Sequence, residues 1–150
     1  MSDSILRIIP ADPALVPDVG AQQSAGTHAR KAFPKADEVT VRVEEDVTFV
    51  DAGGNFEAVF CPACEAELEQ ERWADARDRA AASSFVNLAV SAPCCGAPTS
   101  LNDLRYEMPQ GFARLIIEVM NPNTAEVPRG VERLLRDTLG CEIRFVWAHY

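Results

Sequence analysis

The sequence lacks the features by which secreted and membrane proteins are recognised. Its first residues show no basic start followed by a continuous apolar stretch and a small-residue cleavage site, and no later apolar run approaches the length of a membrane span. It also contains no Asn-x-Ser/Thr glycosylation acceptor. We therefore expect a cytoplasmic protein without membrane association.

Residues for the common kinds of catalysis are scarce as well. The chain has two histidines. His28 lies in a polar stretch and is expected at the surface, whereas His149 shares strand parity with Trp147 and is expected in the core or at its rim. We recognise no Ser/His/Asp or Cys/His set and no glycine-rich phosphate loop, since Gly53-Gly54 alone indicates a turn. These absences favour a protein that is not an enzyme.

The sequence has few basic residues: it contains 14 lysines and arginines but 23 aspartates and glutamates, so its net charge is −9. Binding of DNA or RNA depends on basic residues that displace counterions from phosphate, so we expect no nucleic-acid partner. The acids concentrate between residues 37 and 57, where Arg42 is the one base. They are Asp37, Glu38, Glu44, Glu45, Asp46, Asp51 and Glu57. This run is either a solvated strand face or a docking surface for a basic protein partner.

A chain of 150 residues, 47% hydrophobic and 25% charged, can bury a core as one domain without disulfides. The clearest patterns lie at its two ends. Alanines and glutamines over 18–32 are compatible with a helix, and apolar periodicity predicts a second helix over 127–139. Strands are predicted over 5–9, 39–49 (continuous, or folded at Glu44-Glu45-Asp46), 113–120 and 143–147. Residues 113–120 are nearly all apolar, so we expect them in a central strand that is buried on both faces.

The middle of the chain has weaker patterns. Gly53-Gly54-Asn55 predicts a tight turn that joins the valine-rich strand to a second strand at 56–60, in a hairpin. A helix is expected over 65–82, where neither glycine nor proline occurs. A strand over 85–90 follows, and then a loop or a short helical turn over 99–111.

These elements form two β-α-β halves, and the segment 52–100, which carries four of the five cysteines, is inserted between them. The arrangement resembles the ferredoxin-like fold, in which a split β-α-β pattern builds one sheet. The predicted fold class is therefore α+β: one domain (1–150) with a ferredoxin-like split β-α-β sheet and an inserted zinc-binding hairpin and helix.

The cysteines indicate metal chemistry, because clustered pairs in a reducing compartment suggest a metal or redox site before a disulfide framework. Cys61-Pro62-Ala63-Cys64 resembles the knuckle of zinc ribbons and rubredoxin-like sites, in which a tight turn directs two thiolates to one ion. The pair Cys94-Cys95 departs from that pattern, since adjacent residues of an extended strand point in opposite directions. Both can be ligands only if the backbone turns there, as Pro93 and Gly96 allow. Cys141 is expected to be a small buried residue.

Three interpretations of the cysteines stay open. Zinc is bound by Cys61, Cys64, Cys94 and Cys95, or by three of these with His28 or His149, or no metal is bound. Iron is an alternative to zinc in the same site. Without a metal, a strand, Cys-x-x-Cys and a helix from Glu65 resemble thioredoxin-like proteins, although the acids at the start of that helix would raise the pKa of a nearby thiol.

Taken together, these features predict a zinc-stabilised, non-enzymatic protein-interaction module, such as an adaptor, an accessory subunit or an acidic inhibitor or immunity-type protein. Its partner would be a protein, basic in character, that binds through the acids of residues 37–57. The alternative function is a thiol redox or metal-handling protein that uses Cys61 and Cys64.

Overall fold

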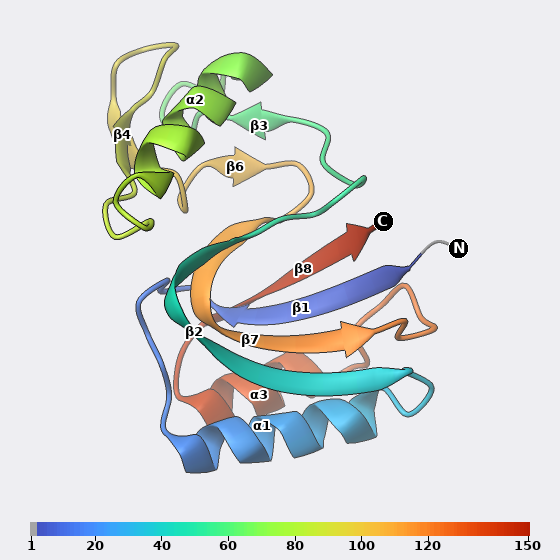
Figure 1. Ribbon diagram of the computed structural model, residues 1–150. Helices are drawn as coiled ribbons and strands as arrows, with labels where there is room; N and C mark the ends of the chain where they lie inside the picture. The colour runs from blue at the N-terminus through green and yellow to red at the C-terminus, as the bar shows by residue number, and fades with distance from the viewer. Residues whose placement is uncertain (1–2) are drawn as a thin grey trace.

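Four strands form the main sheet of the protein. The computed structural model describes residues 3–150. The strands are β1 (Ser4–Pro10), β2 (Glu38–Val50), β7 (Gly111–Met120) and β8 (Ile143–His149). Their order is β2-β7-β1-β8, and each neighbouring pair is antiparallel. Two helices, α1 (Val19–Ala32) and α3 (Val131–Leu139), lie together on one face of this sheet (Figure 1). The predicted α+β class is confirmed.

The ends of these helices follow from local sequence. Asp18 caps α1, because its Oδ1 accepts a hydrogen bond from the Ala21 amide at 2.8 Å. Helix α3 ends at Gly140, whose φ of 71° is a left-handed conformation that glycine adopts without strain. This helix begins later than the predicted residue 127, because Gly130 has a φ of 85° and interrupts the helical path. Within residues 3–150, no helix combines the length and the apolar character that crossing a membrane requires.

The main core lies between the sheet and the two helices. Aliphatic residues of β1 and β7 meet small residues of α1 and the apolar face of α3. The buried members are Leu6, Ile8, Ala25, Ala29, Phe33, Leu115, Ile117, Val119, Val131, Leu135 and Leu139. On the opposite face of β7, Ile116 is 1% exposed and packs in a smaller cluster with Ile9 and Val146. The predicted central position of this strand is confirmed. Its second face is only partly buried, because Arg114, Glu118 and Met120 are half-buried there.

Between β2 and β7 the chain leaves the main sheet and forms a second, smaller unit, the inserted segment (residues 51–110) (Figure 1). Its elements are β3 (Val59–Phe60), α2 (Gln70–Ala81), β4 (Ala89–Ser91), β5 (Pro98–Ser100) and β6 (Arg105–Tyr106). Strand β3 pairs with β6, and β4 pairs with β5, both antiparallel. The chain re-enters the main sheet at Gly111, and the bounds of 52–100 for a zinc-binding segment stay a prediction.

An aromatic core centred on Trp73 holds the inserted segment together. Phe56 stacks on the indole with ring centroids 5.1 Å apart, and Tyr106 meets it edge-on at 6.1 Å. The Tyr106 hydroxyl accepts a hydrogen bond from Trp73 Nε1 (3.2 Å) and donates one to the Leu101 carbonyl (2.6 Å). Phe112 of β7 is fully buried in the same core. The inserted segment is therefore packed onto the main sheet.

The predicted hairpin across Gly53-Gly54-Asn55 is wrong. Gly53 has the expected positive φ (58°), but the Gly54 amide donates to the carbonyl of His149 at the end of β8 (2.7 Å), so the turn leads away from β2. Phe56 then enters the aromatic core, and only Val59–Phe60 forms a strand, paired with β6. Tertiary packing overrides the local alternation of apolar residues.

Helix α2 also begins later than predicted, at Gln70 rather than Glu65. Residues 61–66 form a tight turn instead, and Phe60 and Glu67 form a β-bridge across it. The absence of glycine and proline permitted a helix there without requiring one.

The strand predicted over 85–90 forms only at Ala89–Ser91. Ser84 and Phe85 have positive φ values of 54° and 58°, which an extended strand excludes. Residues 99–111, predicted as a loop or a short helical turn, include the end of β5, the short strand β6 and the first residue of β7.

A bulge interrupts β2 within the acidic run. Val43 pairs with Leu115 and Thr48 with Ala113, so residues 44–47 lie opposite Arg114 alone. Strand β2 is therefore one long strand with a bulge at the predicted folding point.

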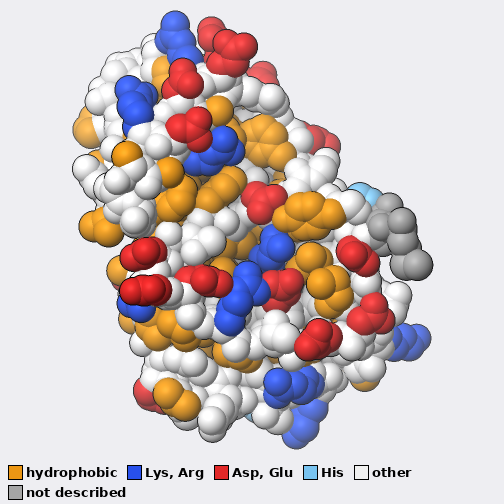
Figure 2. Space-filling model, viewed as in Figure 1, with side chains coloured by type: hydrophobic (Ala, Val, Ile, Leu, Met, Phe, Trp, Pro, Cys, Tyr) orange, Lys and Arg blue, Asp and Glu red, His pale blue; other side chains and the backbone are white. Residues whose placement is uncertain are grey.

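Other acids of the run are engaged on the face of the sheet opposite α1 and α3, where Arg7 and Arg42 lie between the carboxylates of Glu44, Asp51 and Glu118. Figure 2 shows basic and acidic side chains next to one another near the centre of the molecule.

Candidate metal centre

The first cysteine pair lies in a tight turn directly after β3. The Cys61 amide donates to the Ala66 carbonyl, and the Cys61 carbonyl accepts from the Glu65 amide, both at 2.9 Å. Glu65 takes a φ of 63°, the left-handed conformation that closes the turn. The Ala63 amide lies 3.4 Å from Cys61 Sγ and donates to it. The turn therefore directs Cys61 and Cys64 toward the same space.

The second cysteine pair lies in a turn of the same construction, between β4 and β5. The Ala92 amide donates to the Ala97 carbonyl (2.9 Å), and the Ala92 carbonyl accepts from the Gly96 amide (2.7 Å). Gly96 takes a φ of 73°. The change of backbone direction that Cys94 and Cys95 need in order to face one ion is therefore present.

The two turns correspond residue by residue. Cys-Pro-Ala-Cys-Glu-Ala (61–66) and Ala-Pro-Cys-Cys-Gly-Ala (92–97) share proline at the second position, cysteine at the fourth and alanine at the sixth. Both have their positive φ at the fifth position. Cys64 therefore corresponds to Cys95. The sequence carried this signal, but pairing the cysteines by their own spacing missed it.

One ligand position differs between the turns. Ala92 stands where the first turn has Cys61, and Cys94 stands where the first turn has Ala63. Ala92 is 2% exposed and packs in the aromatic core of the inserted segment. The second turn thus supplies its additional sulfur from the residue next to Cys95.

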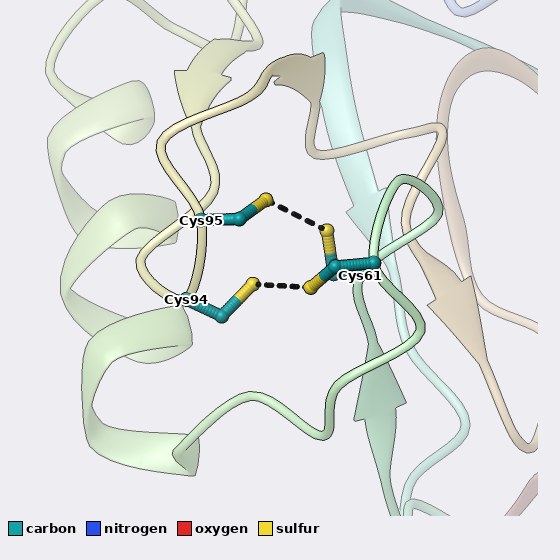
Figure 3. A group of neighbouring side chains, drawn as sticks. Cys61, Cys94 and Cys95 are labelled. Atoms are coloured by element: carbon teal, nitrogen blue, oxygen red, sulfur yellow. Dashed lines mark hydrogen bonds between the residues drawn. The ribbon is translucent and has the colours of Figure 1, made fainter.

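The two turns face each other, with Cys94 and Cys95 directed at the turn that carries Cys61 (Figure 3). Cys61 Sγ lies 3.8 Å from Cys95 Sγ, and Cys64 Sγ lies 3.3 Å from Cys94 Sγ. All four sulfurs lie within 4.8 Å of one another. Cys61 is buried and the other three are exposed. The structure brings the four predicted ligands together, and they could hold one metal ion.

Hydrogen bonds and crowding move the pKa values of these thiols apart. The backbone N–H of Cys64 donates to Cys61 Sγ and lowers the pKa of that thiol to about 7. Contact with the Cys64 thiol, together with partial desolvation by the neighbouring groups, raises the pKa of Cys94 to about 12. Thiols this close resist joint ionisation, because like charges disfavour one another. A bound cation removes that penalty and favours coordinating thiolates.

The donor set fits a tetrahedral thiolate site. A Zn–S distance of about 2.3 Å places four sulfurs about 3.8 Å apart, close to the 3.8 Å and 3.3 Å contacts between the turns. Four thiolates occupy all four coordination positions of a tetrahedral ion and leave no open position for water or substrate. The amides that donate to Cys61 Sγ are outer partners of the kind that orient metal ligands. Zinc and iron both accept this set of sulfurs.

The other candidate residues lie outside the sulfur group. His28 is in α1, and His149 is near the end of β8, where its Nδ1 lies 3.2 Å from Ser4 Oγ. Cys141 packs at the edge of the main core, and burial raises the pKa of its thiol. Because α2 starts only at Gln70, the first cysteine pair does not sit at the N-terminus of a helix, as a thioredoxin-like arrangement would require.

A groove of about 470 Å³ opens beside the second turn, between α2 and β4. Ala92 and Pro93 belong both to this turn and to the groove, so the two share a wall. Trp73 lines its apolar floor, and Arg72 and Arg79 are the charged residues of the described lining.

Comparisons with protein-family models, with curated proteins and with solved structures found no match for this chain. The role of the four-cysteine group is therefore inferred from its geometry.

Proposed function

We propose that Cys61, Cys64, Cys94 and Cys95 bind one structural zinc ion, and that the chain is a non-enzymatic protein-interaction module stabilised by this ion. The observation that carries the proposal is the pair of equivalent turns that brings four sulfurs within 4.8 Å of one another. A site closed by four thiolates has no position for a substrate, so the ion contributes to folding rather than to catalysis.

The ion joins two points that are distant along the chain. Helix α2 lies between the two turns, and its buried residues are Trp73, Ala76 and Ala80. A metal bond between the turns closes this stretch into a loop and restricts the unfolded chain, which adds to the stability that the small apolar face provides.

For the remainder of the chain we propose the ferredoxin-like architecture, with the inserted segment as an addition to it. The order of the strands supports this assignment. Strand β7 lies between β2 and β1, and β1 lies between β7 and β8, so two β-α-β units are interleaved in one antiparallel sheet. Fold class does not determine function, so the assignment adds nothing to the role.

Charge favours a basic protein as the partner of the module. The net charge of −9 attracts cations over a distance and increases the rate at which a basic surface is encountered. An adaptor, an accessory subunit and an acidic inhibitor or immunity-type protein would each use such a surface.

Metal analysis of the purified protein tests the zinc proposal. We expect about one zinc ion per chain in gently purified, reduced protein, and its loss in Cys64→Ser and in Cys94→Ser. Cys141→Ser is the matched control, because it changes a thiol outside the group and should retain the metal. Absence of metal in the wild type, or equal loss in Cys141→Ser, would contradict the site.

Replacement of the metal by cobalt(II) tests the ligand set independently. Four thiolates around cobalt produce an intense sulfur-to-metal charge-transfer band and the visible bands of tetrahedral coordination. Loss of one thiolate lowers the intensity of the charge-transfer band. A spectrum of octahedral cobalt would contradict the tetrahedral site.

The second candidate function is a thiol redox or metal-handling protein that uses Cys61 and Cys64. One observation favours it: the pKa of Cys61 is lowered to about 7, which increases the thiolate fraction at neutral pH. Cys61 is fully buried, however. Titration of free thiols with and without a chelator separates the two functions, since zinc masks the thiols and a redox site leaves Cys61 reactive.

A further inference from the structure

A cleft of about 630 Å³ lies where the inserted segment meets the main sheet. Segments far apart in sequence form its walls: the chain after β1, the bulge of β2, and the loop between α2 and β4. None of the four clustered cysteines is among the described residues that line it. The cleft is therefore separate from the metal centre.

Carboxylates surround this cleft. Asp12, Glu45, Asp46 and Asp103 line it, and all four are exposed. Arg114 is the basic residue of the described lining, and its Nε is engaged with a carbonyl of the β2 bulge at 3.1 Å. A concave surface lined by charges of one sign concentrates its field and attracts the opposite charge.

An apolar side chain stands beside these carboxylates. Val86 is 80% exposed, and it follows Ser84 and Phe85, which both have positive φ values (54° and 58°). This conformation is unusual for a residue as bulky as phenylalanine. The Phe85 ring holds the turn in place by packing 5.3 Å from Phe112, between ring centroids. The turn thereby presents Val86 to solvent at the cleft, near the half-buried Leu88.

We propose that this cleft is the docking site for a partner protein, through a segment in which basic side chains flank an apolar one. The inference rests on the proposed function of an interaction module and specifies its surface. Lysine or arginine side chains would meet the four carboxylates, and the apolar side chain would pack against Val86. A nucleic acid is disfavoured because carboxylates repel phosphate, and a second copy of the chain brings the same net charge of −9.

Only some of the acids of residues 37–57 line this cleft. Glu45 and Asp46 line it, because the bulge in β2 removes them from the strand ladder. Glu44 and Asp51 instead pair with arginines of the sheet. The docking charge is therefore concentrated in the bulge rather than spread along the whole run.

Binding of a synthetic peptide of alternating lysine and leucine, measured by fluorescence anisotropy, tests the proposal. The double reversal Glu45→Lys/Asp46→Lys should weaken binding by about tenfold or more at low salt, mainly through slower association. Val86→Ser should weaken it by about threefold, through lost apolar contact. The matched control, Glu126→Lys/Asp137→Lys, makes the same change in net charge at two exposed acids outside the cleft, and should alter binding by less than about twofold because of screening.

Three results would overturn the docking site: no binding of the peptide to the wild type, equal weakening by the control reversal, or no effect of Val86→Ser. Zinc content is measured for every variant. If the cleft variants contain zinc and bind the peptide as tightly as the wild type does, the docking site is overturned and the metal centre is not affected. If the purified wild type contains no metal but its peptide binding still depends on Glu45, Asp46 and Val86, the metal centre is contradicted and the docking site is supported.

Discussion

The main sheet and the inserted segment are stabilised in different ways. The sheet with α1 and α3 buries an aliphatic core in which Leu6, Ile8, Leu115 and Leu135 have no exposed surface. The strands of the inserted segment have at most three residues, and its core surrounds a single tryptophan. Small units of this kind usually need a cross-link or a metal to fold. Under the proposed function, a metal ion bound by the four cysteines would take the place of long paired strands.

Removal of the metal by a chelator should have the largest effect, and this effect should be confined to the inserted segment. Structural zinc contributes on the order of 10 kcal/mol to the folding of small zinc modules. The amides of Cys61 and Ala92, which close the two turns, should therefore lose their protection from hydrogen exchange, while those of β7 keep it. Hydrogen exchange with mass spectrometry checks this. Uniform loss of protection would mean that the two parts unfold as one cooperative unit.

Leu135→Ala should destabilise the main sheet and leave the metal centre intact. The side chain is fully buried in the main core, so its truncation should lower the free energy of unfolding by about 3 kcal/mol. Leu134→Ala is the matched control on the same helix, because Leu134 is 43% exposed and its truncation should cost less than about 1 kcal/mol. Denaturant unfolding and metal content are the measurements. Equal costs for the two variants would contradict the placement of the core.

Tyr106→Phe should destabilise the inserted segment in particular. The change leaves Trp73 Nε1 and the Leu101 carbonyl without their buried partner, at a cost of about 2 kcal/mol. Tyr150 is 51% exposed, and its hydroxyl contacts Arg7 and Asp51 outside this core. Tyr150→Phe is therefore the control, and thermal unfolding should distinguish the two. A neutral Tyr106→Phe would contradict the role of this hydroxyl.

The smallest expected effects compare the two turns with each other. Glu65 adopts a φ of 63°, so Glu65→Gly should stabilise the first turn by about 1 kcal/mol. Gly96→Ala should destabilise the second turn by a similar amount, because a methyl group there meets nothing within 4 Å and only the φ of 73° opposes it. Competition with a chelator measures both changes as shifts in metal affinity. Shifts in the same direction would contradict the equivalence of the turns.

The ends of the chain were predictable because local pattern and burial coincide there. Residues 113–120 are mostly apolar and form the central strand β7. Val131, Leu135 and Leu139 recur at the helical period that places them on the main core. The middle was not predictable in the same way. Phe56 alternates like a strand residue, but Trp73 offers it a stacking partner that the sequence does not reveal.

The parts of the candidate site also differ in how far the sequence predicts them. Cys61-Pro62-Ala63-Cys64 could be recognised directly, because its turn closes through bonds between residues at most five positions apart. The second turn was not recognised as its equivalent, since Ala92 occupies the position of Cys61. The cleft could be predicted only in part, because Glu45 and Asp46 belong to the acidic run of residues 37–57, whereas Asp12 and Asp103 lie far from it along the chain.

Residue pattern alone is sufficient to predict the elements and motifs whose stabilising contacts are local: the long strands, the two helices on the sheet and the first cysteine turn. Periodicity, capping and turn formation act over a few residues and can therefore be read along the chain. Three features follow instead from long-range packing: the second turn faces the first, α2 starts after the first turn, and the β2 bulge opens onto a cleft. These features depend on contacts between distant residues, such as Cys64 with Cys94, whose formation depends on how the intervening chain packs.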